Sequence, residues 1–346
     1  MPATRLKGKM LDGGWTVKEL VAAKPSGTGG NFSVRYTVEH EDGREAFLKA
    51  MDFSHALQAP DITVALQEAL EEYNFEKGVY EMCKEHKMSR VVTPLDSGSY
   101  QTDIPGMEGK VFYIIFEQAQ GDLRCDESRA NFSDLEWILR VLHQTAVGIR
   151  QLHSKEIAHQ DLKPSNILLF PDKGSKVSDL GRSSVKSNPF KWDGAIYPGD
   201  YTYAPVEKFW KVRYGEFSDR FSTDLYLLGS LFYYYFLDVS ASAAIQNKMQ
   251  FISFNFSTST FDEALPYLRQ AFEESLGDIE AHIKGMGSTL SAAIIQIIKE
   301  LCEPDPRLRG KRSANNMFDQ YGLQRYISKL DLLAKKAKLE ANDKRR

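Results

Sequence analysis

The front of the chain alternates apolar and polar residues in short stretches. Residues 34–38 are apolar at every second position, and the apolar stretch 46–48 follows after the pair Asp42-Gly43. This alternation, interrupted by an Asp-Gly turn, is typical of a β-hairpin. A continuous apolar run over 111–116 predicts a further, buried strand.

Helical spacing of apolar residues begins near residue 61. A predicted helix over 61–86 has Asp61 or Thr63 as its N-cap. Its apolar face consists of Leu66, Leu70, Tyr73 and Tyr80. After Gly121-Asp122 the helical patterns become long, and they predict helices over 137–153, 224–237, 289–302 and 324–346.

A strand-rich front and a helix-rich back predict an α+β fold with two lobes joined near residues 117–120. We expect an N-lobe over 1–119, a helical C-lobe over 120–322 and a basic C-terminal helix or tail over 323–346. The most apolar run, 225–237, is shorter than the roughly 20 residues of a membrane span, so it predicts a buried helix and no membrane segment.

Composition narrows the functional class. The chain has 346 residues, 42% of them hydrophobic and 26% charged, which is ordinary for a globular protein. Its formal net charge of −3 argues against a general nucleic-acid-binding role. Three scattered cysteines favour neither a disulfide framework nor a zinc site, and no apolar leader opens the sequence, so we expect a cytoplasmic setting.

Chemistry-bearing residues are densest in two neighbouring segments. The segment 159–166 reads His-Gln-Asp-Leu-Lys-Pro-Ser-Asn, and 176–181 reads Lys-Val-Ser-Asp-Leu-Gly, with a predicted hairpin between them. Folding that hairpin brings Asn166 and Asp179 together, which is an oxygen-rich arrangement suited to Mg²⁺. Asp161 is expected at the mouth of this hairpin.

These two segments resemble the catalytic loop and metal-binding triplet of the protein kinase superfamily, in its eukaryotic-like serine/threonine form. The resemblance implies a two-lobed fold that uses ATP with Mg²⁺ or Mn²⁺. It implies that Asp161 is the catalytic base and that Lys163 steadies the transferring phosphoryl group. It also implies that Asn166 and Asp179 hold the metal, with Leu180 in place of the usual Phe.

The glycine-rich stretch 27–34 resembles the loop that covers the phosphates of ATP. Gly27, Gly29 and Gly30 would let backbone N–H groups approach the phosphates, and Val34 would cover adenine. A glycine cluster alone is more often a plain flexible turn. Phe32 or Ser33 stands where the family has its third glycine. Lys49, which closes the next strand, would contact the α- and β-phosphates.

A carboxylate is expected to orient Lys49, and the helix over 61–86 offers several. The candidates are Glu68, Glu71, Glu72 and Glu76. Glu76 is our choice because its spacing from Tyr73 and Tyr80 places it on the apolar face, although helical glutamates are commonly solvated.

The stretch 113–119 resembles the hinge that hydrogen-bonds adenine through its backbone. Glu117 and Ala119 would supply those backbone groups, and Phe116 would guard the back of the nucleotide pocket. The alternative is a plain core strand.

Three further features favour a protein substrate with a Ser or Thr acceptor. Pro205-Val206-Glu207 resembles the Ala-Pro-Glu that ends the activation segment, and Arg309 would pair with Glu207. Asp224 would anchor the catalytic loop from a buried helix.

Some residues depart from the family pattern. Gln160 replaces an arginine that binds an activating phosphate, so control would come from elsewhere, such as 53–61 or the tail. Asp200 replaces a threonine and could pair with Lys163. Two consequences of this pairing stay open: it could hold the loop together, or it could crowd Asp161 with like charge and hamper catalysis. Candidate autophosphorylation sites, which could equally be plain solvated residues, are Ser183, Ser184 and Ser187.

Two alternatives to an active protein kinase follow. A catalytically impaired pseudokinase would bind nucleotide without transferring phosphate. A small-molecule kinase would lack the Glu207 and Arg309 pairing. For the lysine-rich tail, a regulatory helix and a solvated end both stay open.

Overall fold

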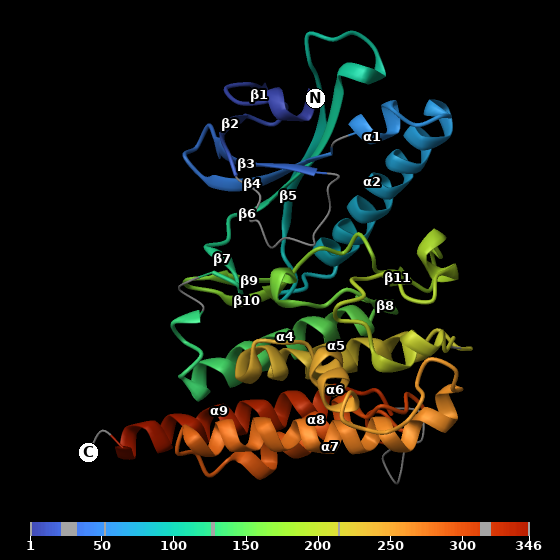
Figure 1. Ribbon diagram of the computed structural model, residues 1–346. Coiled ribbons are helices and arrows are strands. Elements are labelled where there is room, and N and C mark those ends of the chain that lie inside the picture. Colours follow the sequence, from blue (N-terminus) through green and yellow to red (C-terminus); the bar gives the residue numbers. More distant parts are fainter. Residues whose placement is uncertain are drawn as a thin grey trace. The chain divides into compact units, whose positions relative to one another are not determined.

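The computed structural model describes residues 2–21, 33–51, 53–125, 129–213, 215–311 and 320–344, and it divides the chain into two compact units. The β-rich unit comprises Met1–Gly121 and Leu168–Asp172, and the helical unit comprises Asp122–Ile167 and Lys173–Arg346. The fold is that of an α+β protein in which the first part of the sequence forms a sheet and the later part is mainly helical, as the hydrophobic pattern predicts (Figure 1).

A six-stranded antiparallel sheet, in the order β1-β2-β3-β4-β6-β5, forms the centre of the β-rich unit. Its strands are β1 (Met10–Leu11), β2 (Trp15–Leu20), β3 (Ser33–His40), β4 (Glu45–Met51), β5 (Pro94–Gln101) and β6 (Lys110–Glu117). The predicted hairpin corresponds to β3 and β4. Leu48 of β4 lies opposite Tyr36 of β3 and Ile115 of β6, so apolar residues of three strands share one face.

The first residues of the chain cover part of this sheet, which the sequence did not predict. A 3₁₀ helix, η1 (Pro2–Arg5), places Ala3 in the same buried cluster as Leu6, Tyr36 and Leu48. The buried Tyr36 hydroxyl donates a hydrogen bond of 2.9 Å to the Ala3 carbonyl oxygen. That bond satisfies a polar group inside an otherwise apolar core.

Two helices accompany the sheet, α1 (Ser54–Leu57) and the long α2 (Ile62–Glu85). Asp61 is the N-cap of α2, because its side chain accepts a 3.1 Å hydrogen bond from the Val64 N–H. The second half of α2 is the buried half, where Tyr73, Glu76 and Tyr80 face inward. The Tyr80 ring packs edge-on against Phe116 of β6, with centroids 4.7 Å apart.

Short strands and 3₁₀ helices surround the segment 159–166. Strands β7 (Gly121–Asp122), β9 (Ile167–Phe170) and β10 (Gly174–Val177) form a small sheet, and β8 (Ile157–Ala158) pairs with β11 (Ser184–Val185). The remaining 3₁₀ helices are η2 (Met107–Gly109), η3 (Pro164–Asn166), η4 (Lys191–Gly194) and η5 (Val206–Trp210). The predicted hairpin between Asn166 and Asp179 corresponds to β9 and β10.

The helical unit is organised around α5, whose residues Leu225–Tyr235 are all buried. Its helices are α4 (Leu135–His153), α5 (Asp219–Leu237), α6 (Ala241–Met249), α7 (Phe261–Gly285), α8 (Ser291–Cys302) and α9 (Gln324–Lys344). Helix α5 starts at Asp219, ahead of the predicted start at Asp224. At Gly229 a side chain would meet Cys302 Sγ at 2.3 Å, so glycine permits the close packing of α5 on α8.

Two findings correct the expected organisation of the back half. Helix α7 was not predicted, although Thr260 and Glu263 form a capping box at its start. The C-terminal helix α9 packs along α4 (Figure 1) and buries an apolar face. Its buried residues are Tyr326, Ile327, Leu330, Leu333, Ala334 and Ala337. A fully solvated end is therefore the wrong interpretation of this segment.

Candidate active site

Residues 159–166, the expected catalytic loop, follow β8 and are anchored by Asp224 of α5. The buried Asp224 carboxylate accepts hydrogen bonds from the backbone N–H groups of His159 (2.7 Å) and Gln160 (2.8 Å). It also lies 2.8 Å from His153 Nε2, at the end of α4. Gln160 has a φ of +65°, an uncommon conformation outside glycine, and these bonds help to hold it. His153 was not singled out by sequence analysis; only its place just ahead of the loop hinted at it.

Asp161 lies at the centre of a polar cluster. Its Oδ2 is 3.1 Å from Lys163 Nζ and 3.3 Å from Asn166 Nδ2, and its Oδ1 accepts a 2.7 Å hydrogen bond from the Asp200 N–H. Burial raises the pKa of Asp161, the positive charge of Lys163 opposes this rise, and the carboxylate of Asp179 adds to it. Asp161 is therefore an acidic group, fixed by its hydrogen bonds, that binds a proton more tightly than a free aspartate does.

Asn166 and Asp179 are brought to neighbouring places, as the predicted hairpin requires. Ser178, which precedes Asp179, donates both its N–H (2.9 Å) and its hydroxyl (3.1 Å) to the Asn166 carbonyl oxygen. Asn166 Nδ2 donates to the Asp161 carbonyl oxygen at 2.7 Å. The donor set is an amide oxygen and a carboxylate, which is the hard oxygen chemistry that Mg²⁺ takes when phosphates and water complete its shell. Among the residues described, no cluster of three or more His, Cys, Asp or Glu forms a metal site.

In the β-rich unit, Lys49 of β4 pairs with Glu76 of α2. Lys49 Nζ is 2.7 Å from Glu76 Oε1 and 2.9 Å from Oε2. The lysine side chain is 22% exposed and the glutamate side chain 7%, so the pair is mostly buried. Glu76 is thus the member of the acidic series Glu68, Glu71, Glu72 and Glu76 whose carboxylate the structure records on Lys49.

The residues expected around adenine are only partly described. Phe116 is buried at the end of β6, and Val34 in β3 is half-buried. Glu117 is tied to Thr93, since its N–H donates to the Thr93 carbonyl (3.2 Å) and its Oε1 accepts from the Thr93 N–H (2.8 Å). Gly27, Gly29, Gly30 and Phe32 lie outside the described residues, and Ala119 follows shortly after β6.

A second ion pair lies deep in the helical unit. Arg309 Nη1 and Nη2 are 2.9 and 2.8 Å from the two carboxylate oxygens of Glu207, and both side chains are fully buried. Arg309 also donates to the Glu303 carbonyl oxygen (3.0 Å) and the Ser222 hydroxyl (3.2 Å). This bidentate pair fastens η5, at the end of the activation segment, to the loop after α8.

Asp200 pairs with Lys163, as the sequence analysis expected. Lys163 Nζ is 3.3 Å from Asp200 Oδ2, so the lysine lies between the carboxylates of Asp161 and Asp200. The preceding Gly199 makes this approach possible, because a side chain there would meet the Gln160 carbonyl oxygen at 2.4 Å and Asp161 Oδ1 at 2.8 Å. The carboxylates of Asp161 and Asp200 thus share one lysine.

The three candidate autophosphorylation residues differ in exposure. Ser183 and Ser184 are buried, and the Ser183 hydroxyl donates to the Leu180 carbonyl oxygen at 2.7 Å. Ser187 is exposed. An acceptor hydroxyl must reach a nucleotide, so only Ser187 of these three is presented for modification in this conformation.

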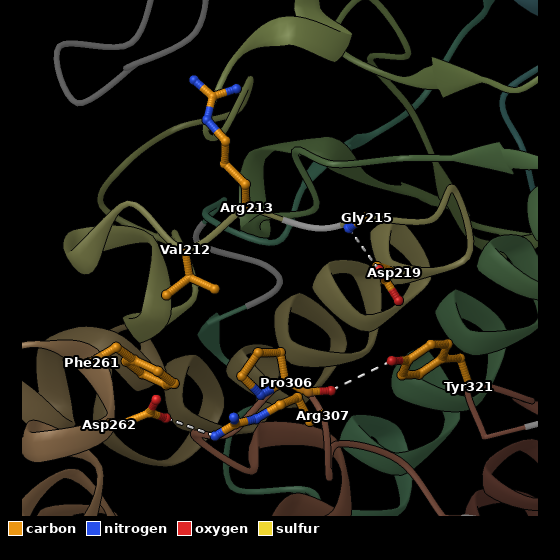
Figure 2. A pocket seen from close by; sticks show the side chains of 9 residues that line it. All are labelled: Val212, Arg213, Gly215, Asp219, Phe261, Asp262, Pro306, Arg307 and Tyr321. Atoms are coloured by element: carbon orange, nitrogen blue, oxygen red, sulfur yellow. Dashed lines mark hydrogen bonds and ion pairs between the residues drawn. The ribbon is translucent and has the colours of Figure 1, made fainter.

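A cavity of about 300 Å³ in the helical unit lies apart from this cluster. Figure 2 shows its floor, where Phe261, Pro306 and Tyr321 gather beside the ion pair of Arg307 with Asp262, whose atoms are 2.9 Å apart. Arg213 and Asp219 line the opposite side. Neither Asp161 nor its partners contribute to this cavity.

Comparison with known proteins shows which family the chain resembles. The model of the protein kinase domain matches residues 22–320. The serine/threonine-protein kinase SBK1 of Danio rerio is 33% identical over 96 residues, which is 27% of this chain and 24% of the relative. The interferon-induced, double-stranded RNA-activated protein kinase of Rattus norvegicus is 35% identical over 98 residues, 27% of this chain and 18% of the relative.

A longer but weaker alignment joins the chain to a probable cyclin-dependent serine/threonine-protein kinase of Dictyostelium discoideum. It has 27% identity over 216 residues, 59% of this chain and 15% of the relative. All three alignments cover about a quarter or less of each relative's own length. In the described part of the chain, none of the helices has the length and apolar character that crossing a membrane requires. With the kinase model matching most of the chain, this protein belongs to the protein kinase family.

Proposed function

We propose that this chain is a serine/threonine protein kinase that transfers the γ-phosphate of ATP to a protein hydroxyl, with Asp161 as catalytic base. The observation that supports the proposal most is the convergence of Lys163, Asn166 and the Asp200 N–H on one buried carboxylate. These contacts hold Asp161 in a single orientation. A carboxylate held in this way can accept the proton of an attacking hydroxyl.

The other polar residues take roles that follow from their chemistry. Lys163 carries positive charge beside Asp161, so it would offset negative charge that develops on the transferring phosphoryl group. Lys49, oriented by Glu76, would bind the α- and β-phosphates of ATP. Asn166 and Asp179 would hold the divalent cation, which when bound neutralises phosphate charge.

The remaining predictions from the sequence belong to the same proposal. The glycine-rich residues Gly27, Gly29 and Gly30 with Val34 would cover the nucleotide, and the backbone of Glu117 and Ala119 would bind adenine. The lobes would run over 1–119 and 120–322. A cytoplasmic setting is supported by the three cysteines, which are buried and form no disulfide in the described residues; they are Cys83, Cys125 and Cys302.

A protein substrate is favoured by the buried Glu207 and Arg309 pair. That pair fastens the end of the activation segment, the part of a protein kinase that meets its substrate. Competing interpretations are a small-molecule kinase and a nucleotide-binding pseudokinase, and the experiment below separates all three.

The test is transfer of labelled γ-phosphate from Mg-ATP to the protein itself and to a generic basic protein. We expect transfer by the wild type and loss of about a thousandfold or more in Asp161→Asn, as for removal of a catalytic carboxylate. Asp172→Asn, in an exposed turn, is the matched control and should keep full activity. ATP binding measured separately completes the assay.

Each outcome has one meaning. Transfer that survives Asp161→Asn would remove Asp161 from the role of base. ATP binding by the wild type without transfer to any acceptor would favour the pseudokinase. Transfer to a small alcohol or an antibiotic but to no protein would favour the small-molecule kinase.

A further inference from the structure

The stretch between Asp179 and Glu207, which is the expected activation segment, contains an acidic residue, Asp193, in the short helix η4. Asp193 Oδ2 accepts a 2.7 Å hydrogen bond from the Phe190 N–H, which closes the turn. The Asp193 side chain is 18% exposed. A carboxylate of such low exposure needs a counter-charge, because burial disfavours its charged form.

Arg220, in the first turn of α5, supplies that counter-charge. Arg220 Nε lies 3.2 Å from Asp193 Oδ1, and Arg220 Nη2 donates to the Asp193 carbonyl oxygen at 3.2 Å. One guanidinium group therefore forms a hydrogen bond with the backbone of Asp193 and an ion pair with its side chain, whose Oδ1 accepts no hydrogen bond in the described part of the chain. The Arg220 side chain is 23% exposed, so water screens this pair less than a surface pair.

Gln160 connects this ion pair to the catalytic loop. Its side-chain amide, Nε2, donates a 2.8 Å hydrogen bond to the backbone carbonyl oxygen of Arg220. Its backbone N–H is bound by Asp224. The residue that immediately precedes Asp161 thus contacts the same turn of α5 that binds the activation segment.

Neighbouring contacts reinforce the attachment. The Arg182 guanidinium lies over the ring of Trp192, 3.9 Å from its centroid, and Arg213 Nη1 donates to the Gly194 carbonyl oxygen at 3.1 Å. Cation–π contact and hydrogen bond flank Asp193 on both sides in the sequence. All of these contacts form between residues that carry no covalent modification.

We propose that Asp193 and Arg220 are positioning residues, which order the activation segment and, through Gln160, the catalytic loop, without phosphorylation of that segment. We call Asp193, Arg220 and Gln160 the activation-segment latch. A carboxylate carries its charge permanently at neutral pH, whereas a phosphate must be added. The activity test of this inference rests on the proposed kinase function, whereas the hydrogen-exchange test described below depends on the structure alone.

Asp193→Asn tests the latch, because asparagine keeps the size and the acceptor for Phe190 N–H but removes the charge. We expect kcat to fall about tenfold and KM for the protein substrate to rise, while Kd for ATP stays within about twofold. Asp193→Glu should recover most of the activity. Asp262→Asn breaks a comparable Asp–Arg pair on the exposed surface and should change nothing.

Hydrogen exchange of the peptide over 186–200 is measured on the same nucleotide-free proteins. We expect faster exchange in Asp193→Asn and in Gln160→Ala than in the wild type, with an unchanged melting temperature. The exchange test stays valid even if the wild type transfers no phosphate. That result would contradict only the proposed function. Exchange and kcat both unchanged in Asp193→Asn would overturn the latch.

Independence from phosphate is tested on phosphatase-treated wild type whose unmodified state is verified by mass spectrometry. We expect its initial rate to match that of the untreated protein, without a lag. A rate that drops severalfold after treatment and returns after incubation with Mg-ATP would overturn this part of the proposal.

Discussion

Two ion pairs of this protein each join a basic side chain to a glutamate, and their surroundings differ. Lys49 and Glu76 meet in the β-rich unit, where the lysine side chain is 22% exposed. Glu207 and Arg309 meet in the helical unit, where neither side chain is exposed. The lysine of the first pair keeps partial exposure, whereas both side chains of the second pair are fully buried.

The difference lies in what else each cation contacts. Arg309 donates to Glu303 and Ser222 as well as to Glu207, and it lies 4.8 Å from the centroid of the Tyr226 ring. All of these neighbours are protein groups. An ion pair of this kind acts on the fold, and an accessible one such as Lys49 with Glu76 can act on a ligand.

The largest effect is expected for Arg309→Met, which leaves the buried carboxylate of Glu207 without its partner. Removal of one member of a buried ion pair costs about 3 to 5 kcal/mol of unfolding free energy. Urea unfolding followed by circular dichroism measures this cost. Arg129→Met, in an exposed pair with Asp238, is the control and should cost at most about 1 kcal/mol. Equal costs in the two variants would contradict the comparison.

Lys49→Met is expected to act on activity. Loss of the phosphate contact should lower kcat/KM for ATP by about a hundredfold, equivalent to about 2.7 kcal/mol of transition-state stabilisation. The unfolding free energy should also fall, because the Glu76 side chain is only 7% exposed and loses this partner, but by less than in Arg309→Met, since the Lys49 side chain is 22% exposed. Lys18→Met, on the exposed pair with Glu39 in the same sheet, should leave both quantities unchanged. A large loss of stability with normal activity would show that Lys49 acts on the fold and not on ATP.

Lys208, beside Glu207, is a buried cation whose stability effect depends on pH. Burial lowers the pKa of Lys208 from 10.5 to about 8, and the charge of Glu207 opposes this. The unfolded chain is protonated here below about 10.5 and the folded protein only below about 8. The penalty is therefore fully present below about pH 8 and disappears as the pH rises through about 10.5.

Lys208→Met removes that penalty, which corresponds to about 3 kcal/mol, but also the 3.1 Å hydrogen bond to the Val212 carbonyl oxygen, worth about 1 kcal/mol. We expect the variant to be more stable than the wild type by about 2 kcal/mol at about pH 7, and this advantage to shrink between about pH 8 and about pH 10. Melting temperatures over this range check it. An advantage independent of pH would show that Lys208 is not the titrating group.

The smallest effect is expected in α9. Glu340 accepts hydrogen bonds from the Ser288 hydroxyl (2.7 Å) and the Thr289 N–H (3.0 Å), just before α8. Glu340→Gln should lower the unfolding free energy by about 1 kcal/mol and leave kcat unchanged. Asp343→Asn, which neutralises an exposed carboxylate on the same helix, serves as the control. A change in kcat would instead support a regulatory role for α9.

Local patterns allowed much of the fold and of the candidate site to be predicted. The period-two alternation indicated β3 and β4, and helical spacing indicated α2, α4 and α8 close to their observed bounds. The same spacing favoured Glu76 over the neighbouring glutamates, because only an inward-facing carboxylate can reach the sheet. The roles of these residues stay predictions until they are measured.

Patterns were less informative where an element depends on distant neighbours. Helix α7 was missed although it has a capping box, and η1 was missed because the buried residues Ala3 and Leu6 in and beside it gain their partners only from the sheet. The lysines of α9 suggested a solvated end, while its apolar stripe is buried against α4. Composition alone does not say which face of a helix finds a partner.

The sequence alone was sufficient for the period of β3, β4, β6 and most of the long helices, the order of the expected catalytic motifs and the family they resemble. Tertiary structure was needed for the place of Asp200 beside Lys163 and for the ion pair of Asp193 with Arg220. It also showed that Glu207 and Arg309 are sealed from water while Lys49 is not. The reason is that periodicity and motifs are local properties of the chain, whereas burial and charge pairing depend on which distant segments pack together.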